Sequence, residues 1–132
     1  MKQLYKVSSP LKVYFGKKVL RAFSLNLNVY RNYNRFKLGT VKKNYYQIMK
    51  PQIEHLPKFR KLKLEYVLYA GSRHKQDLMN ICSITDKFFC DCLVIDRKIK
   101  DDDYTIIPEI KFRFGGIDKN NPRVDIFLKE DS

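Results

Sequence analysis

Residues 62–69 read Leu-Lys-Leu-Glu-Tyr-Val-Leu-Tyr, and a polar link joins them to a helical pattern at about 80–94. Alternation with a period of two predicts a half-buried strand, and apolar residues three or four positions apart predict a helix with one buried face. Asn80 is the predicted N-cap of this helix. Its buried face is expected to comprise Ile81, Ile84, Phe88, Cys92 and Ile95. Asp86 falls nearly opposite that face and is expected to be a solvated surface charge.

Shorter elements are expected on either side of this strand and helix. Strands are predicted over four further segments: 13–15, 19–23, 105–114 and 124–128. A helix is predicted over 40–53, ending or kinking near Lys50 because Pro51 follows, and 24–35 is expected to be a loop. The chain length of 132 residues fits one domain. The order of elements predicts an α/β (α+β) fold, in which two main helices pack on a mixed β-sheet.

Charge is distributed unevenly along the chain, whose formal net charge is +13. Residues 1–63 hold 16 Lys and Arg against the single acid Glu54, a net charge of +15, whereas residues 64–132 hold 11 bases and 13 acids, a net charge of −2. Such asymmetry points to a polyanionic partner, and we expect nucleic acid. The alternative is a merely basic protein, or one that contacts an acidic membrane or an acidic protein. The sequence thus predicts a strongly basic half and an acid-cluster half.

Basic side chains near aromatic ones are expected to contact DNA phosphates. In the segment 24–35, Tyr30 and Tyr33 are interleaved with Asn and Arg, which suits phosphate contact and base stacking. Simple packing of the two tyrosines is an equal alternative. The expected nucleic-acid-binding residues are Arg31, Arg35, Lys37, Lys42, Lys43, Arg73 and Lys75. No single-strand motif stands out, which makes an RNA-binding function the weaker hypothesis.

Carboxylates concentrate at both ends of the predicted helix at 80–94. Asp101, Asp102 and Asp103 follow it in succession, and their mutual repulsion costs stability unless a cation or a basic group offsets it. Asp77 precedes the helix, and the compact strand-helix-strand unit is expected to bring Asp77 and Asp102 together. Mg²⁺ binds through carboxylate and water oxygens and usually takes one or two protein carboxylates. The pattern predicts metal-dependent phosphodiester chemistry, with solvated turns and helix caps as the alternative.

The cysteines and the apolar segments indicate in which cell compartment the protein is expected. Cys90 and Cys92 point about 200° apart on the predicted helix that also holds Cys82, so reduced and partly buried thiols are expected rather than a disulfide or a zinc site. The first six residues contain no apolar run typical of a signal peptide. No stretch approaches the roughly 20 apolar residues that span a bilayer. A cytoplasmic protein with no membrane partner is expected.

Residues 73–104 carry a specific motif. They contain Asp77-Leu78-Met79-Asn80, then Lys87-x3-Asp91-Cys92-Leu93, then Asp101-Asp102. This series resembles the RusA-like Holliday-junction resolvases of phages and prophages, whose pattern reads Asp-Leu-Asp-Asn, a helix with Lys and then Asp-x-Leu, and a loop ending in Asp-Asp. The segments 26–30 and 121–126 are similar to the family's N-terminal portion and closing strand, so the resemblance spans most of the chain.

The resemblance implies a role for each matching residue. Asp77 and Asp102 would be metal-binding carboxylates, Asp101 an adjacent acid that also serves the metal, Lys87 the catalytic lysine and Asp91 a supporting acid. It also implies Mg²⁺, for which Mn²⁺ can substitute, and a homodimer. The implied activity is a structure-selective endonuclease that resolves branched DNA such as four-way junctions, in a bacterial or phage-infected host cell.

The sequence departs from the family pattern at three points. Met79 stands where the family has a second acid, and a thioether is a poor ligand for a hard cation such as Mg²⁺. Four extra residues separate Asn80 from Lys87, and the usual glycine before Asp101-Asp102 is absent. The alternative function is therefore a catalytically impaired DNA-binding or regulatory protein on the same scaffold.

Overall fold

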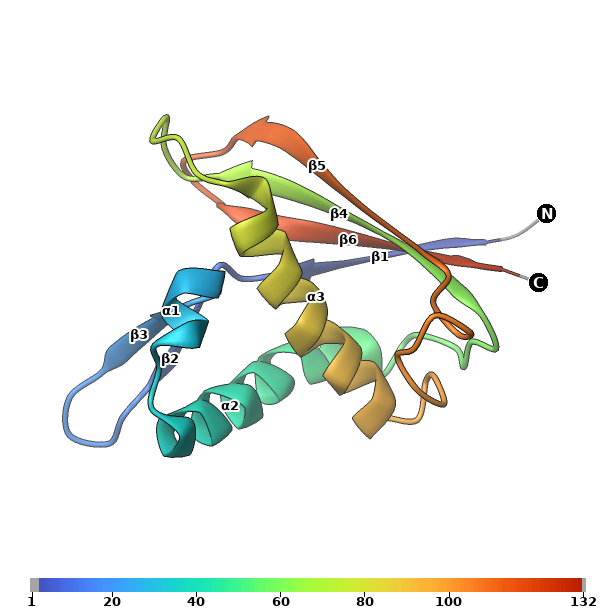
Figure 1. The fold of residues 1–132 in the computed structure, drawn as a ribbon, viewed down its shortest axis with the longest axis horizontal. Coiled ribbons are helices and arrows are strands. Elements are labelled where there is room, and N and C mark those ends of the chain that lie inside the picture. Colours follow the sequence, from blue (N-terminus) through green and yellow to red (C-terminus); the bar gives the residue numbers. More distant parts are fainter. Residues whose placement is uncertain (1–2, 132) are drawn as a thin grey trace.

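The computed structural model describes residues 3–131, which form a four-stranded sheet, a separate two-stranded sheet and three helices (Figure 1). The elements are β1 (Leu4–Ser9), β2 (Lys12–Phe15), β3 (Arg21–Ser24), α1 (Leu27–Arg31), α2 (Arg35–Ile53), β4 (Leu62–Ala70), α3 (Leu78–Ile95), β5 (Glu109–Ile117) and β6 (Arg123–Glu130). The main sheet has the order β1-β6-β4-β5, antiparallel except for the parallel pair β4–β5. The expected α+β fold with a mixed sheet is confirmed.

The core lies between the main sheet and α3, which carries the chain from β4 to β5. Parallel neighbours require such a crossover because the second strand must begin at the same end of the sheet as the first. The helix-facing side of β4 is fully buried and consists of Leu62, Leu64, Tyr66, Leu68 and Ala70. Four of the five residues predicted for the buried face of α3 are buried: Ile81, Ile84, Phe88 and Cys92. Ile95 is 60% exposed because α3 ends there, at the rim of the packed layer.

Residues 12–53 form a lobe beside the main sheet, which we call the N-terminal lobe (Figure 1). The β2–β3 hairpin confirms the two predicted strands and their turn. The prediction of a loop over 24–35 is wrong, because this segment contains α1. Asn26 caps that helix, with its Oδ1 accepting a hydrogen bond from the Asn28 amide at 2.8 Å. A helix of five residues is too short to produce a periodic apolar pattern.

The second helix of the lobe, α2, extends beyond its predicted limits at the N-terminal end and passes through its proline. Asn34 Oδ1 accepts from the amides of Phe36 and Lys37 at 2.8 and 3.3 Å, which starts the helix at Arg35. Pro51 costs one backbone hydrogen bond, yet it lies in the last turn and the helix continues to Ile53. The predicted last residue, Ile53, is therefore observed, whereas the predicted start at Thr40 is five residues late. The buried residues of α2 are Val41, Tyr45, Met49 and Ile53.

The last strands differ from prediction mainly where β5 begins. Residues 103–107 turn instead of extending, because the amides of Ile106 and Ile107 both donate to the Asp103 carbonyl, at 3.1 and 2.9 Å. The strand predicted from 105 therefore begins at Glu109. β6 contains the predicted strand 124–128 and is longer by a few residues.

Candidate functional site

A cavity of about 300 Å³ lies between α2, α3 and the loop that follows α3; we call it the acid pocket. Its charged residues are Lys42 from α2, Asp91 from α3, and Asp101 and Asp102 from the loop. Its other lining residues are Tyr45, Tyr46, Phe88, Cys92, Val94 and Ile95. The structure thus brings three of the predicted site carboxylates to one cavity. It adds one of the lysines that the sequence assigned to phosphate binding.

The carboxyls of the acid pocket influence one another electrostatically. The pKa of Asp102 is raised above its ordinary value, first by partial burial and then by the neighbouring Asp101 carboxyl and the negative charge of Asp91. The Asp102 amide donates a hydrogen bond to Asp101 Oδ1 at 2.8 Å, which holds the Asp101 carboxyl against the backbone of Asp102. Like charges held together favour a bound cation or a nearby ammonium group. A cation or ammonium group near Asp102 would therefore favour its ionised form.

Two lysine ammonium groups lie over one aromatic ring beside the acid pocket. Lys42 Nζ lies 6.0 Å from the ring centroid of Tyr30 and 5.9 Å from that of Phe88, and Lys87 Nζ lies 5.8 Å from that of Tyr30. Lys87 precedes Asp91 by one helical turn, so the two side chains are neighbours on the surface of α3. Residues from α1, α2 and α3 thus hold two positive charges next to the carboxyl cluster.

The tyrosines of the lobe pack against other aromatic rings. Tyr30 makes an edge contact with Phe88 at 6.3 Å between ring centroids, and Tyr33 contacts Phe23 at 4.7 Å and Phe15 at 6.0 Å. Both tyrosines are half-buried. These contacts favour the packing alternative that the sequence left open.

Asp77 lies away from the acid pocket, and the expected pairing of Asp77 with Asp102 is corrected. Asp77, not Asn80, is the N-cap of α3, and its Oδ1 accepts a hydrogen bond from the Met79 amide at 2.9 Å. Asp91 lies 14 residues further along the same helix, about 21 Å at 1.5 Å per residue, and Asp102 shares its cavity. The physical reason is the long crossover helix, which places its two flanking loops at opposite ends of the sheet.

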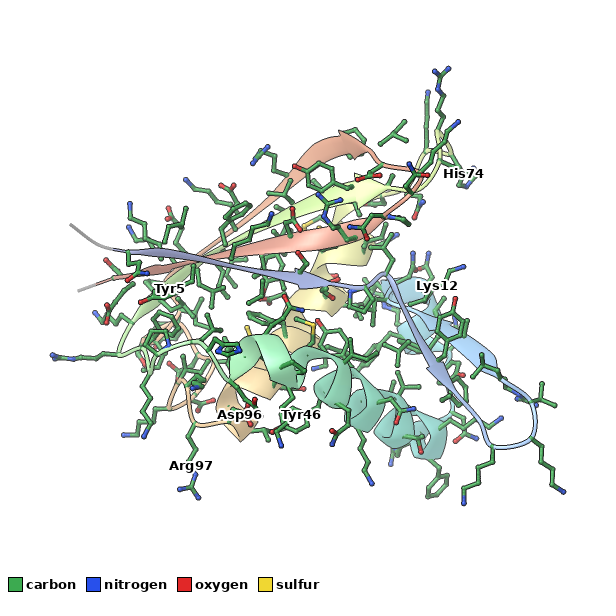
Figure 2. All side chains as sticks on the ribbon, turned by 180° about the vertical axis from the view of Figure 1, so that it is seen from behind. Tyr5, Lys12, Tyr46, His74, Asp96 and Arg97 are labelled. Carbon is green, nitrogen blue, oxygen red and sulfur yellow. The ribbon has the colours of Figure 1, made fainter. Side chains whose placement is uncertain are left out.

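Figure 2 shows the same separation. His74, in the loop that leads into α3, lies at the opposite end of the molecule from Asp96, the C-cap of α3. At the Asp96 end, the Tyr46 hydroxyl donates a hydrogen bond to Asp96 Oδ1, which ties the end of α3 to α2. Within one chain, the two ends of α3 therefore cannot contribute to one metal site.

Asp86 is not the solvated charge that the sequence predicted. Its Oδ1 accepts hydrogen bonds from the Tyr66 hydroxyl at 2.5 Å and from Cys90 Sγ at 3.3 Å. Burial raises its pKa, the Tyr66 and Cys90 hydrogen bonds oppose that rise, and the charges of Asp102 and Asp91 add to it. The helical period placed Asp86 correctly away from the predicted buried face of α3. On that side, however, Tyr66 of β4 packs against α3 and covers the Asp86 carboxyl.

The predicted phosphate-binding residues occupy two regions of the surface. All of them are exposed except Lys42, which is half-buried. Arg73 and Lys75 lie in the loop before α3, near His74 in Figure 2. The others lie in the N-terminal lobe: Arg31, Arg35, Lys37, Lys42 and Lys43. Residues 12–53 contain ten Lys and Arg and no Asp or Glu, so the whole lobe is basic.

The sequence analysis missed five of these ten lobe residues, among them Lys17, Lys18 and Arg21. These three residues are exposed at the end of the β2–β3 hairpin. The absence of acids between Lys12 and Ile53 is the signal that could have identified them.

Three further findings concern the cysteines, the metal-ligating side chains and the length of the helices. Cys82, Cys90 and Cys92 are free thiols buried on α3, as predicted. Within residues 3–131, no three His, Cys, Asp or Glu side chains converge as a ready-made set of metal ligands. The helices of that same range include none with the length and apolar content needed to cross a membrane.

Comparisons with known proteins do not assign a family or a function to this site. No protein-family model matches the chain, and no curated protein matches it.

Proposed function

We propose that this protein is a Mg²⁺-dependent, structure-selective endonuclease that resolves Holliday junctions or related branched DNA by phosphodiester hydrolysis. The observation that carries the proposal is the acid pocket, which is lined by Asp91, Asp101, Asp102 and Lys42. The pocket borders a lobe that has ten basic residues and no acid. A phosphodiesterase needs both features next to each other, because the basic surface holds the backbone while the carboxylates serve the reacting phosphate. The resemblance to RusA-like resolvases supports the same substrate class.

The carboxylate oxygens of the acid pocket are the kind of ligand that a hard divalent cation prefers. Mg²⁺ takes one or two protein carboxylates and completes its shell with water, so Asp91 and Asp102 would suffice to hold it, with Asp101 adjacent. The raised pKa of Asp102 among its neighbours supports this choice. When bound there, Mg²⁺ or Mn²⁺ would activate water and offset charge on the phosphate. Asp77 has no part in this set within one chain, since it caps the far end of α3.

The two lysines beside the pocket would bind and orient the phosphate. Lys42 lines the cavity, and the Nζ atoms of Lys42 and Lys87 both lie near the Tyr30 ring. Ammonium groups fixed where negative charge develops stabilise the transition state without reorganising. Lys87 thus keeps the catalytic role that the resemblance implies, and Lys42 joins it. The homodimer that the resemblance implies is part of the same proposal.

Cleavage of a labelled four-way junction tests the proposal. Purified protein is incubated with the junction and Mg²⁺ or Mn²⁺, alongside Asp91→Asn and Asp102→Asn. Asp103→Asn is the matched control, because Asp103 belongs to the same acidic run but does not line the pocket. We expect metal-dependent nicking by the wild type and the control, and its loss from the other two. Nicking that persists in both pocket variants would refute the assignment.

A second candidate function is DNA binding without cleavage, in a regulatory protein on this scaffold. It is favoured by Met79, which replaces an expected acid and is 57% exposed, and by the use of Asp77 as a helix cap. The same assay separates the two functions. Tight junction binding with no nicking in either metal, from the wild type, would support this candidate. An RNA-binding function would appear as preference for single-stranded RNA over junction and duplex DNA.

A further inference from the structure

The end of the β2–β3 hairpin carries two apolar side chains that the chain itself does not bury. This end comprises residues 16–20, Gly-Lys-Lys-Val-Leu, and we call it the hairpin tip. Val19 and Leu20 are 66% and 70% exposed, and Lys17 and Lys18 before them are exposed as well. In Figure 1 the loop that joins β2 to β3 protrudes beyond the helices of the N-terminal lobe. Packing within the chain therefore gives no reason for apolar residues at these two positions.

The base of the hairpin holds the hairpin tip in a fixed position. Phe15 and Phe23 are buried there, and the Tyr33 ring contacts both of them. Gly16 has a φ of +111°, and a Cβ atom at this position would lie 2.2 Å from the Val19 carbonyl oxygen, so the turn requires glycine. An apolar tip on a fixed base loses little conformational freedom when it binds a partner.

The hairpin is tied to the helix that helps to form the acid pocket. Asn44 Nδ2 donates a hydrogen bond to the Tyr14 carbonyl at 3.1 Å, and Lys42, two residues earlier on α2, lines the pocket. Val19 is five residues from Tyr14, so it lies within about 18 Å of that contact at a maximum of about 3.6 Å per residue. That distance corresponds to roughly five base pairs at about 3.4 Å each. The hairpin tip is therefore within reach of a DNA whose phosphate lies at the acid pocket.

We propose that Val19 and Leu20 insert against the bases at the branch point of the DNA and unstack them. The hairpin tip is then the element that selects branched over unbroken duplex DNA. Proteins kink DNA by placing apolar side chains between base steps. Such insertion costs least where stacking is already interrupted, as at a branch point. The inference rests on the proposed function for its branched substrate, but it does not depend on cleavage.

The surroundings of the hairpin tip favour DNA over an anionic membrane. Binding to a bilayer surface increases with the apolar area that is buried, and two aliphatic side chains supply little of it. The ten bases of the lobe are spread over the hairpin, α1 and α2, with no acid among them. Such a spread suits a polyanion that extends along the surface, because each phosphate contact adds to the affinity.

The fluorescence of 2-aminopurine at the branch point of a four-way junction tests the inference, because the emission of this base rises when it unstacks. The titration is made in EDTA, so that cleavage takes no part. The wild type is expected to raise the emission, and Val19→Ser/Leu20→Ser is expected to abolish the rise. This double variant should bind the junction at least about tenfold more weakly, since it loses the burial of two aliphatic side chains. Its affinity for unbroken duplex should equal that of the wild type.

Two control variants separate the apolar contribution from that of charge. Leu4→Ser removes an apolar side chain that is 59% exposed on β1, outside the lobe, and should leave emission and affinity unchanged. Lys17→Ala/Lys18→Ala should weaken junction and duplex binding alike and flatten the salt dependence, whereas Val19→Ser/Leu20→Ser should keep the wild-type salt dependence. Far-UV circular dichroism checks that each variant is folded.

Two results would overturn the inference. The first is junction binding by the wild type with no rise in emission. The second is a rise that Val19→Ser/Leu20→Ser retains in full; if this variant also fails to bind vesicles of phosphatidylserine and phosphatidylcholine that the wild type binds, the hairpin tip contacts membrane instead. Absence of cleavage by the wild type in Mg²⁺, with the rise in emission intact, would refute the proposed endonuclease and leave this inference standing.

Discussion

Removal of three exposed bases from α2 gives a quantitative test of the basic lobe. Arg35, Lys37 and Lys43 are all exposed in the N-terminal lobe, so their replacement by alanine should leave the fold intact. Each phosphate contact contributes about −0.9 to the slope of log K against log salt for duplex DNA, so the triple variant should flatten the slope by about 2.7. At 0.1 M salt the same loss lowers affinity roughly 500-fold relative to the wild type. Fluorescence anisotropy with a labelled junction, titrated at several salt concentrations, measures both quantities.

The matched control removes three exposed bases outside the lobe, Lys58, Lys119 and Lys129. Both triple variants lose the same net charge, but the control should keep the wild-type slope. Equal flattening in the two variants would refute the reasoning, because it would mean that total charge, and not the N-terminal lobe, determines binding.

Three further predictions concern stability and are measured by urea unfolding. Asp77→Ala should lower the free energy of unfolding by about 1 kcal/mol through loss of the α3 N-cap, whereas Asp77→Asn should change it little because Asn also caps well; equal losses would contradict the capping role. The raised pKa of Asp86 means that the native state holds its proton more tightly than the unfolded state, so the stability it contributes at acidic pH is lost as pH rises through its native pKa. Asp86→Asn should remove this loss of stability with rising pH. A variant whose stability depends on pH as the wild type's does would refute the role of Asp86. Within residues 3–131, Ser83 Oγ is buried without a hydrogen-bond partner, so Ser83→Ala should stabilise by about 1 kcal/mol, and destabilisation would argue against it.

The sequence predicted the elements that carry a long periodic pattern and failed where tertiary contacts decide. The strand at 62–69 and the buried face of α3 follow from alternation and from the helical period, and both are observed. The N-cap of α3 was misassigned because Asp77 and Asn80 are equally good caps by residue type. Asp86 was misassigned because a helical angle does not show that Tyr66 of β4 covers that side.

The sequence predicted the part of the candidate site that is local in the chain and missed the part that depends on tertiary packing. Asp91, Asp101 and Asp102 are close in sequence to the end of α3, so the local chain already limits how far apart they lie. The expected pairing of Asp77 with Asp102 failed because the crossover helix α3 is long. The sequence predicted this helix, but it did not show that the loops before and after the helix lie at opposite ends of the sheet. Lys42 reaches the pocket only through packing between α2 and α3, which no local pattern in the sequence contains.

The long crossover helix has a consequence for how this protein can change. The loop before α3 and the loop after it lie at opposite ends of one rigid element, about 27 Å apart by the helical rise over its 18 residues. Substitutions separated by such a distance and sharing no partners usually add in free energy. The Arg73–Lys75 loop can therefore be altered for contact with a nucleic acid, and the Asp101–Asp102 loop for chemistry, without one set of changes altering the effect of the other.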